Sequence, residues 1–123
     1  MKKTFGLFVN EKRIEKQITL RNFSCMIDIS PEYLSKIENG LRAAPNDEVL
    51  ERIATQLLLS TDEKEKLYDL AAESKSSPAL ASDLLVYIKN NGSIHNALRI
   101  AKRCGANEED WQNFIAVLSK KYL

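Results

Sequence analysis

The stretch Thr19–Gly40 reads TLRNFSCMIDISPEYLSKIENG and has the pattern of two short helices joined by a tight turn. Hydrophobic residues recur at helical spacing on both sides of the turn, which predicts helices at about Leu20–Met26 and Pro31–Glu38. Ser30 is a good N-cap, and the proline that follows it suits the first position of a helix. The glycine at position 40 ends the second helix because it tolerates the left-handed conformation.

The two short helices have distinct inner and outer faces. A turn of about three residues between them forces a steep crossing, so the outer face of the second helix projects into solvent. The residues expected to face inward are Leu20, Phe23, Ser24, Ile27, Leu34 and Ile37, with Ile29 in the turn. The residues expected to face outward are Glu32, Tyr33, Ser35, Lys36 and Asn39. These polar side chains could contact base edges or phosphates, since an α-helix fits the major groove of DNA.

Further helices are expected on both sides of this unit, and no convincing strand pattern is present. A first helix is predicted from Thr4 to about Gln17, where hydrophobic residues share one face. A fourth helix is expected after Asn46, a plausible N-cap, and a fifth from about Ser60. Hydrophobic stripes along both predict burial, at Leu50, Ile53, Ala54 and Leu57 in the fourth helix and at Leu67, Leu70 and Ala71 in the fifth.

The segment Lys75–Pro78 is the best linker candidate, because it is small, polar and ended by a helix breaker. It divides the chain into an expected domain over residues 1–75 and a C-terminal three-helix region over residues 76–123. Ser93 and Asn107 are expected to cap the last two helices, and a glycine at position 105 to end the first of these. The regular stripe of the last helix includes Trp111 and Phe114, which are expected in the core.

Composition limits the range of functions without selecting one. The 123 residues suffice for one ordinary domain, or for a small domain with an appendage. The 18 basic and 17 acidic residues give a net charge of +1, so any basic surface must come from local arrangement. No hydrophobic run approaches the roughly 18 residues that span a membrane. The basic start is followed by polar residues rather than the core of a signal peptide, so a cytoplasmic location is expected.

No residue pattern points to catalysis. His95 has no companion at the spacing of a metal site or a catalytic triad. Cys25 and Cys104 lie far apart with no CxxC spacing, which favours two reduced thiols over a zinc site or a disulfide. There is no glycine-rich loop of the kind that holds phosphate groups. The sequence therefore predicts no enzyme, no catalytic or metal-binding residue and no cofactor.

The segment Ile29–Gly40, ISPEYLSKIENG, resembles the Cro/C1-type (Xre-like) helix-turn-helix family, whose usual pattern is V-S-x-x-Y-L-S-x-I-E-N-G. The resemblance covers about Phe5 to Leu58 and includes Pro45 and the helix that follows it. It implies an all-α fold with a five-helix, lambda-repressor-like DNA-binding domain, followed here by a small C-terminal helical region. In such a domain the third helix, Pro31–Glu38, enters the major groove.

The resemblance also implies roles for single residues on and near that third helix. Glu32, Tyr33 and Lys36 match the family's base-reading face. Pro31 occupies a matching position but offers only an apolar contact, for example to a thymine methyl group. Positions that often contact phosphates are matched by Ser30, Ser35 and Asn39.

Two charged sites beyond that face are implied as well. Arg42, just past the helix, could reach a neighbouring phosphate or the minor groove. Arg13 and Glu38 match a basic–acidic pair that in many members ties the first helix to the end of the third, and their role is taken as structural.

The chain departs from the family pattern at several positions. The turn commonly contains glycine, where this chain has Asp28, which can visit the left-handed region at modest cost. The family often has a glutamine near the start of the second helix to hold phosphate, and Arg21 or Asn22 could substitute for it. Ser24 replaces the usual alanine at the tight crossing. Glu32 could accept a hydrogen bond from a cytosine amino group, or its negative charge could instead repel DNA and so limit nonspecific binding.

The sequence thus predicts a sequence-specific DNA-binding transcriptional regulator, expected to be a repressor. Its partner is double-stranded DNA with a palindromic operator, because a homodimer presents two reading helices one DNA turn apart. The C-terminal helices or the fifth helix would form the dimer interface. The alternative is an antitoxin or other interaction protein that binds a protein partner through its C-terminal helices and autoregulates its operon.

Overall fold

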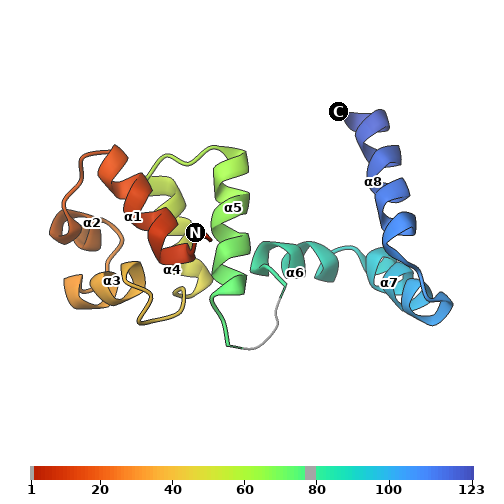
Figure 1. Ribbon diagram of the computed structural model, residues 1–123, viewed down its shortest axis with the longest axis horizontal. Helices are drawn as coiled ribbons and strands as arrows, with labels where there is room; N and C mark the ends of the chain where they lie inside the picture. Colours follow the sequence, from red (N-terminus) through yellow and green to blue (C-terminus); the bar gives the residue numbers. More distant parts are fainter. Residues whose placement is uncertain (1, 77–79) are drawn as a thin grey trace. The chain divides into compact units, whose positions relative to one another are not determined.

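The computed structural model describes residues 2–76 and 80–123, which form eight α-helices with no strand among them (Figure 1). The expected all-α class is therefore confirmed. The helices are α1 (Phe5–Glu15), α2 (Leu20–Met26), α3 (Pro31–Glu38), α4 (Asp47–Gln56), α5 (Thr61–Glu73), α6 (Ser82–Lys89), α7 (Gly92–Cys104) and α8 (Glu108–Tyr122). Contacts group the chain into two compact units, one ending at Leu85 and the other spanning Val86–Leu123.

Each of the first five helices begins at a residue whose side chain accepts a hydrogen bond from the backbone of the first turn. These N-cap residues are Thr4, Thr19, Ser30, Asn46 and Ser60. At α5, Glu63 returns a hydrogen bond to the backbone of Ser60 and completes a capping box. α1 is shorter than the predicted helix, since Thr4 is its cap and Lys16 closes it.

The hydrophobic core of the first unit is built by all five helices, and the helices α1 to α5 gather around it (Figure 1). α3 contacts both α1 and α2, while α5 contacts α1 and α4. The stripes predicted for α4 and α5 are buried, as are Phe23, Ser24, Ile27, Leu34 and Ile37 in the helix-turn-helix. Leu20 is half-buried at the edge of this core. The burial of one face of α3 fixes which of its residues reach solvent.

The turn between α2 and α3 adopts the backbone conformation expected of it. Asp28 has a φ of 58°, in the left-handed region that the sequence analysis assigned to it. Gln17 and Leu58 also have positive φ, at 58° and 53°, directly after α1 and α4. These two positions were not predicted, because neither glutamine nor leucine favours that region.

In the second unit, two of the three predicted helix-end residues have the expected role. Asn107 caps α8 in a capping box with Asp110, and Gly105 ends α7 with a φ of 69°, both as expected. The predicted cap at Ser93 is wrong, because α7 already begins at Gly92 and its N-cap, Asn91, makes no side-chain capping hydrogen bond.

The expectation that Trp111 and Phe114 are core residues is also wrong for the single chain. Their side chains are 37% and 53% exposed, and no residue of Val86–Leu123 is buried.

The boundary between the units lies later in the chain than the linker expected at Lys75–Pro78. Ser77 and Pro78 lie outside the described residues, and the functional division into residues 1–75 and 76–123 stays a prediction. Over the part of the chain that is described, no helix has the length and hydrophobicity needed to cross a bilayer.

Candidate nucleic-acid interface

The helix α3 is held with one face in the core and the other in solvent. Ser30 Oγ accepts a hydrogen bond from the Tyr33 N–H at 3.1 Å and fixes the first turn. Leu34 and Ile37 are buried on the inner face. The opposite face is therefore presented rigidly, as a helix that enters a DNA groove requires.

The side chains proposed to read bases lie on this outer face. Glu32 and Lys36 are exposed, four residues apart and hence on one side of the helix, and neither forms an ion pair among the described residues. Tyr33 and Pro31 are half-buried at the edge of that face. One acceptor and one donor thus remain available to base edges.

Ser35 and Asn39 form a local network near the end of α3. Asn39 Nδ2 donates to the Ser35 carbonyl oxygen at 2.9 Å and to Ser35 Oγ at 3.3 Å. The network orients the Asn39 amide, whose oxygen stays free to accept. The Ser35 hydroxyl keeps its proton, which it can donate to an anion such as phosphate.

Three more predicted phosphate contacts flank α3 and are exposed: Arg21 and Asn22 in the first turn of α2, and Arg42 in the loop after α3. The Asn22 N–H donates to Thr19 Oγ1 at 3.1 Å. Thr19 is thus the N-cap of α2, a role that the sequence analysis did not assign although threonine directly before a hydrophobic periodic run is its usual signal. α2 is in contact with α3, so Arg21 and Asn22 belong to a helix that packs beside the one proposed to read bases.

Arg13 and Glu38 form the pair expected between α1 and the end of α3. Arg13 Nε lies 2.8 Å from Glu38 Oε2, and Nη2 lies 2.9 Å from Oε1. The hydrogen bond and the charge of Glu38 raise the pKa of the guanidinium. Arg13 Nη1 also donates to the Ile18 carbonyl oxygen, and Asn10 Nδ2 donates to Glu38 Oε1, both at 2.8 Å. Asn10 was missed, since its position depends on the packing of α1 against α3.

Two further supports of the interface were not found from the sequence. Arg52 of α4 donates from Nε to the Ile27 carbonyl oxygen at 2.8 Å and so ties the end of α2 to α4. Gly6 of α1 lies directly against the end of α3, where an added Cβ would collide with the Ile37 carbonyl oxygen and lie 2.7 Å from that of Glu38. Neither contact has a local signal, because each joins segments far apart in the sequence.

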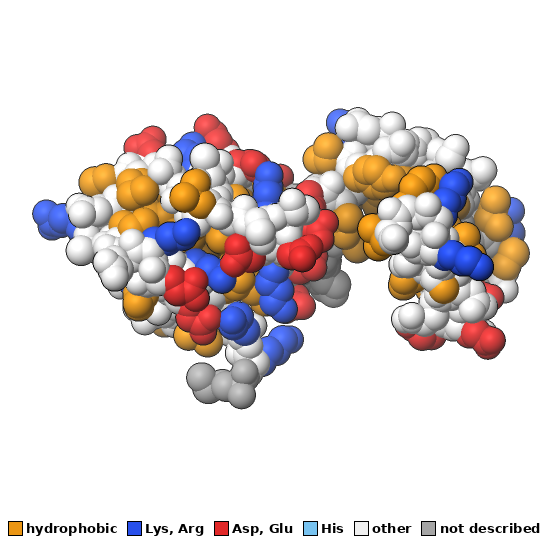
Figure 2. All heavy atoms as spheres, turned by 90° about the horizontal axis from the view of Figure 1, so that it is seen from above, with side chains coloured by type: hydrophobic (Ala, Val, Ile, Leu, Met, Phe, Trp, Pro, Cys, Tyr) orange, Lys and Arg blue, Asp and Glu red, His pale blue; other side chains and the backbone are white. Residues whose placement is uncertain are grey.

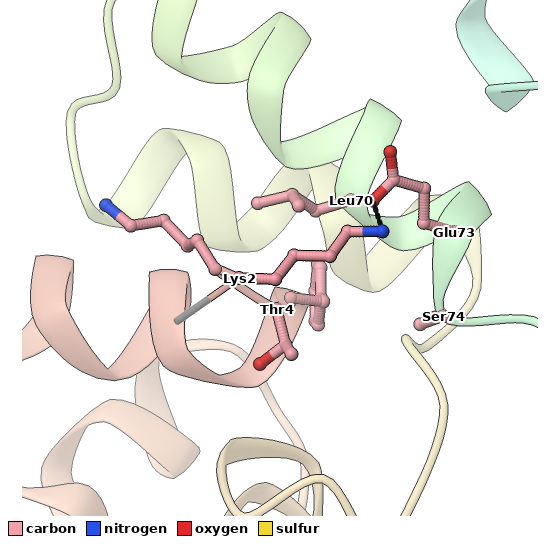
Figure 3. A pocket seen from close by; sticks show the side chains of 7 residues that line it. Lys2, Thr4, Leu70, Glu73 and Ser74 are labelled. Carbon is pink, nitrogen blue, oxygen red and sulfur yellow. Dashed lines mark ion pairs between the residues drawn. The ribbon is translucent and has the colours of Figure 1, made fainter.

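A pocket of about 150 Å³ lies away from this face, between the start of α1 and the end of α5 (Figure 3). Lys2 Nζ lies 3.9 Å from Glu73 Oε2 there, and both side chains are largely exposed. Such a pair contributes little and marks no binding site. Among the described residues, no group of three or more His, Cys, Asp or Glu is placed to hold a metal ion.

Comparison with known proteins agrees with this geometry. Residues 9–64, from within α1 to the first turn of α5, match the model of a family described as helix-turn-helix. A search of curated protein sequences gives no match. Among solved structures, one described as a SinR protein/SinI protein complex contains a similar chain, at 20% sequence identity and a TM-score of 0.50. The similarity covers 96% of this chain and 97% of that one, and it concerns the fold.

Proposed function

We propose that this chain, whose residues 9–64 form a helix-turn-helix domain of the Cro/C1 type, is a sequence-specific DNA-binding transcriptional repressor that reads the major groove with α3. The observation that carries the proposal is the two-faced burial of α3. Leu34 and Ile37 are buried on one side, while Glu32 and Lys36 are exposed on the other and form no ion pair among the described residues. A helix packed this way presents donors and acceptors at fixed spacing.

Within this proposal the base-reading residues have separate tasks. Lys36 donates to the acceptor groups of a guanine, which is the commonest specific partner of a basic side chain. Glu32 accepts a hydrogen bond from a cytosine amino group. Where the base offers no such donor, the carboxylate opposes binding. Tyr33 and Pro31 contribute contacts from the edge of the face, with Pro31 against a thymine methyl group.

The phosphate contacts set the position of the helix and carry no sequence information. We assign them to Arg21 and Asn22 on one side of α3, to Ser30, Ser35 and Asn39 on the helix itself, and to Arg42 beyond it. With a net charge of +1, the protein has little general attraction for DNA. Binding therefore depends on this local set of groups, and it should weaken as salt concentration rises.

One reading helix contacts few base pairs, so we propose that the protein acts as a homodimer on a palindromic operator. Two copies of α3 one DNA turn apart would read two half-sites. A dimer bound to such an operator covers the DNA and prevents other proteins from binding there. For this reason we favour repression over activation.

A second function is favoured by a different observation, the exposed hydrophobic surface of α7 and α8. The chain could be an interaction protein, such as an antitoxin, that binds a protein partner there and represses its own operon through α3. The similar solved chain is described as part of a two-protein complex. A toxin-like gene beside this one, or a small protein that co-purifies with the chain, would favour this function.

The proposed function is tested by selecting bound duplexes from a random library and sequencing them. We expect an enriched inverted repeat with half-site centres about 10 base pairs apart. Glu32→Gln should change the preferred base at one position of each half-site. Lys66→Ala, which alters an exposed lysine of α5, should leave the selected sequence unchanged. Failure to enrich any sequence would contradict specific readout.

A further inference from the structure

The loop between α3 and α4 carries Arg42, the arginine proposed above to contact a phosphate, and it is held mainly at its ends. At the near end, the backbone N–H groups of Gly40 and Leu41 donate to carbonyl oxygens of α3, at 3.1 and 2.8 Å. The middle of the loop, Leu41 to Ala43, is exposed, and a pocket of about 240 Å³ lies between it and the start of α1. The position of Arg42 therefore depends on how the two ends of the loop are fixed.

The far end of the loop is held by two consecutive residues at the end of α5. Ser74 Oγ accepts a hydrogen bond from the Ala44 N–H at 2.9 Å, and Lys75 Nζ donates to the Ala44 carbonyl oxygen at 3.1 Å. Ser74, labelled in Figure 3, also donates from Oγ to the Ala71 carbonyl oxygen at 2.7 Å, which fixes the orientation of its hydroxyl. Both backbone polar groups of the buried Ala44 are thus bound by side chains from a distant part of the sequence.

Few phosphate contacts are available to this protein, so each must be placed accurately. The net charge is only +1, and on the face of the first unit seen in Figure 2 acidic and basic side chains are mixed. Such a surface gives little general attraction for DNA. Phosphate contacts also set the register of the reading helix. A displacement of Ala44 would move Arg42, two residues before it, and so weaken one of these contacts.

We propose that Ser74 and Lys75 are positioning residues for DNA binding, which hold Ala44 and thereby place Arg42 against a phosphate of the operator. This inference rests on the proposed function and extends it to residues outside the helix-turn-helix itself. Both lie beyond residues 9–64, the part of the chain that matches the family. Neither needs to touch DNA to act in this way.

Fluorescence anisotropy of the full chain tests the inference, with the palindrome selected from the random library and a random duplex, over a series of salt concentrations. Arg42→Ala should weaken binding to both duplexes by about tenfold. It should also reduce the slope of log Kd against log salt concentration by about one for each bound copy. Ser74→Ala should produce part of both effects although it removes no charge. A substitution that only destabilised the fold would not change the slope.

A double-mutant cycle shows whether the two residues act through Arg42. In the Arg42→Ala background, Ser74→Ala should have no further effect on Kd. The same should hold for Lys75→Met, which removes the donor and keeps most of the side chain. Ser74→Thr retains the hydroxyl and should restore wild-type binding. Ser76→Ala, at an exposed serine two residues further on, is the matched control and should bind as the wild type does.

Losses that add to that of Arg42→Ala would overturn the inference, and for Lys75 they would indicate a direct contact with phosphate. An Arg42→Ala variant that binds as the wild type does would also overturn it, while leaving sequence readout by α3 intact. A wild type that binds neither duplex would contradict the proposed function, and the inference with it. Lys75→Met, at an exposed position, decides the question even if Ser74→Ala fails to fold.

Discussion

Arg13 and Glu38 join α1 to the last residue of α3 through two parallel hydrogen bonds, with N–O distances of 2.8 and 2.9 Å. The two residues are only 9% and 7% exposed, so the pair is largely shielded from water. Planar guanidinium and carboxylate groups in this arrangement fix orientation as well as distance. The pair therefore sets the angle at which the candidate reading helix is presented.

Removing one partner of this pair should destabilise the protein strongly. Arg13→Leu leaves the Glu38 carboxylate buried and uncompensated, which should lower the free energy of unfolding by about 3–5 kcal/mol. Urea denaturation measures the loss. The double variant Arg13→Leu/Glu38→Leu strands no charge and should cost less than the single one. A single variant within about 1 kcal/mol of the wild type would contradict a structural role for the pair.

Gly6 should tolerate no side chain. In Gly6→Ala the new Cβ meets the carbonyl oxygens of Ile37 and Glu38, and these are backbone atoms that cannot move aside without displacing α3. We expect the midpoint of thermal unfolding to fall. Gly92→Ala is the matched control, because that position in α7 has open space around it. It should be neutral or slightly stabilising, by up to about 1 kcal/mol. Equal effects of the two variants would contradict the close approach.

Asp28 should be replaceable by glycine with a gain in stability. Its φ of 58° is strained for a residue with a Cβ, and glycine adopts it freely. Asp28→Gly should raise the free energy of unfolding by up to about 1 kcal/mol, whereas Asp28→Ala should lower it. Chemical denaturation of both variants checks the sign. A destabilised glycine variant would mean that the aspartate side chain itself holds the turn.

Glu63 should make stability depend on acid pH. The hydrogen bond from Lys12, at 2.6 Å, and the Ser60 backbone lower the pKa of its carboxyl from 4.5 to about 2. Because the folded-state pKa lies below the unfolded value, the stabilisation is fully present above pH 4.5 and is lost as pH falls towards 2.

The comparison with Glu63→Gln isolates that stabilisation. The difference in unfolding free energy between wild type and variant should be constant above about pH 5 and should shrink as the pH falls. Glu65→Gln, at an exposed position of the same helix, gives the background. A difference that stays constant down to pH 2 would show that Glu63 is not coupled to Lys12.

The sequence carried most of the information for the first unit because its signals are local. Caps such as Ser30 and Asn46, the helix-ending glycine and the hydrophobic stripes depend on neighbours a few residues away. The same holds for the outer face of α3, which follows once the inner face is known. The left-handed Asp28 was predictable from the turn in which it lies.

Long-range contacts and the second unit were beyond that reasoning. Gly6, Asn10 and Arg52 support the interface through segments brought together only by folding. The stripe of α8 was regular, but periodicity states which side of a helix is apolar and not what covers it. Trp111 and Phe114 were therefore assigned to a core, whereas no residue of Val86–Leu123 is buried.

The central claim, that α3 reads a DNA sequence, is tested most directly by fluorescence anisotropy with the selected palindrome and a random duplex, at two salt concentrations. The wild type should prefer the palindrome by about a thousandfold or more, and Lys36→Ala should lose most of that preference while Lys66→Ala keeps it. Both duplexes should bind more weakly at high salt. Equal affinity of the wild type for the two duplexes, or a Lys36→Ala variant as selective as the wild type, would contradict the claim.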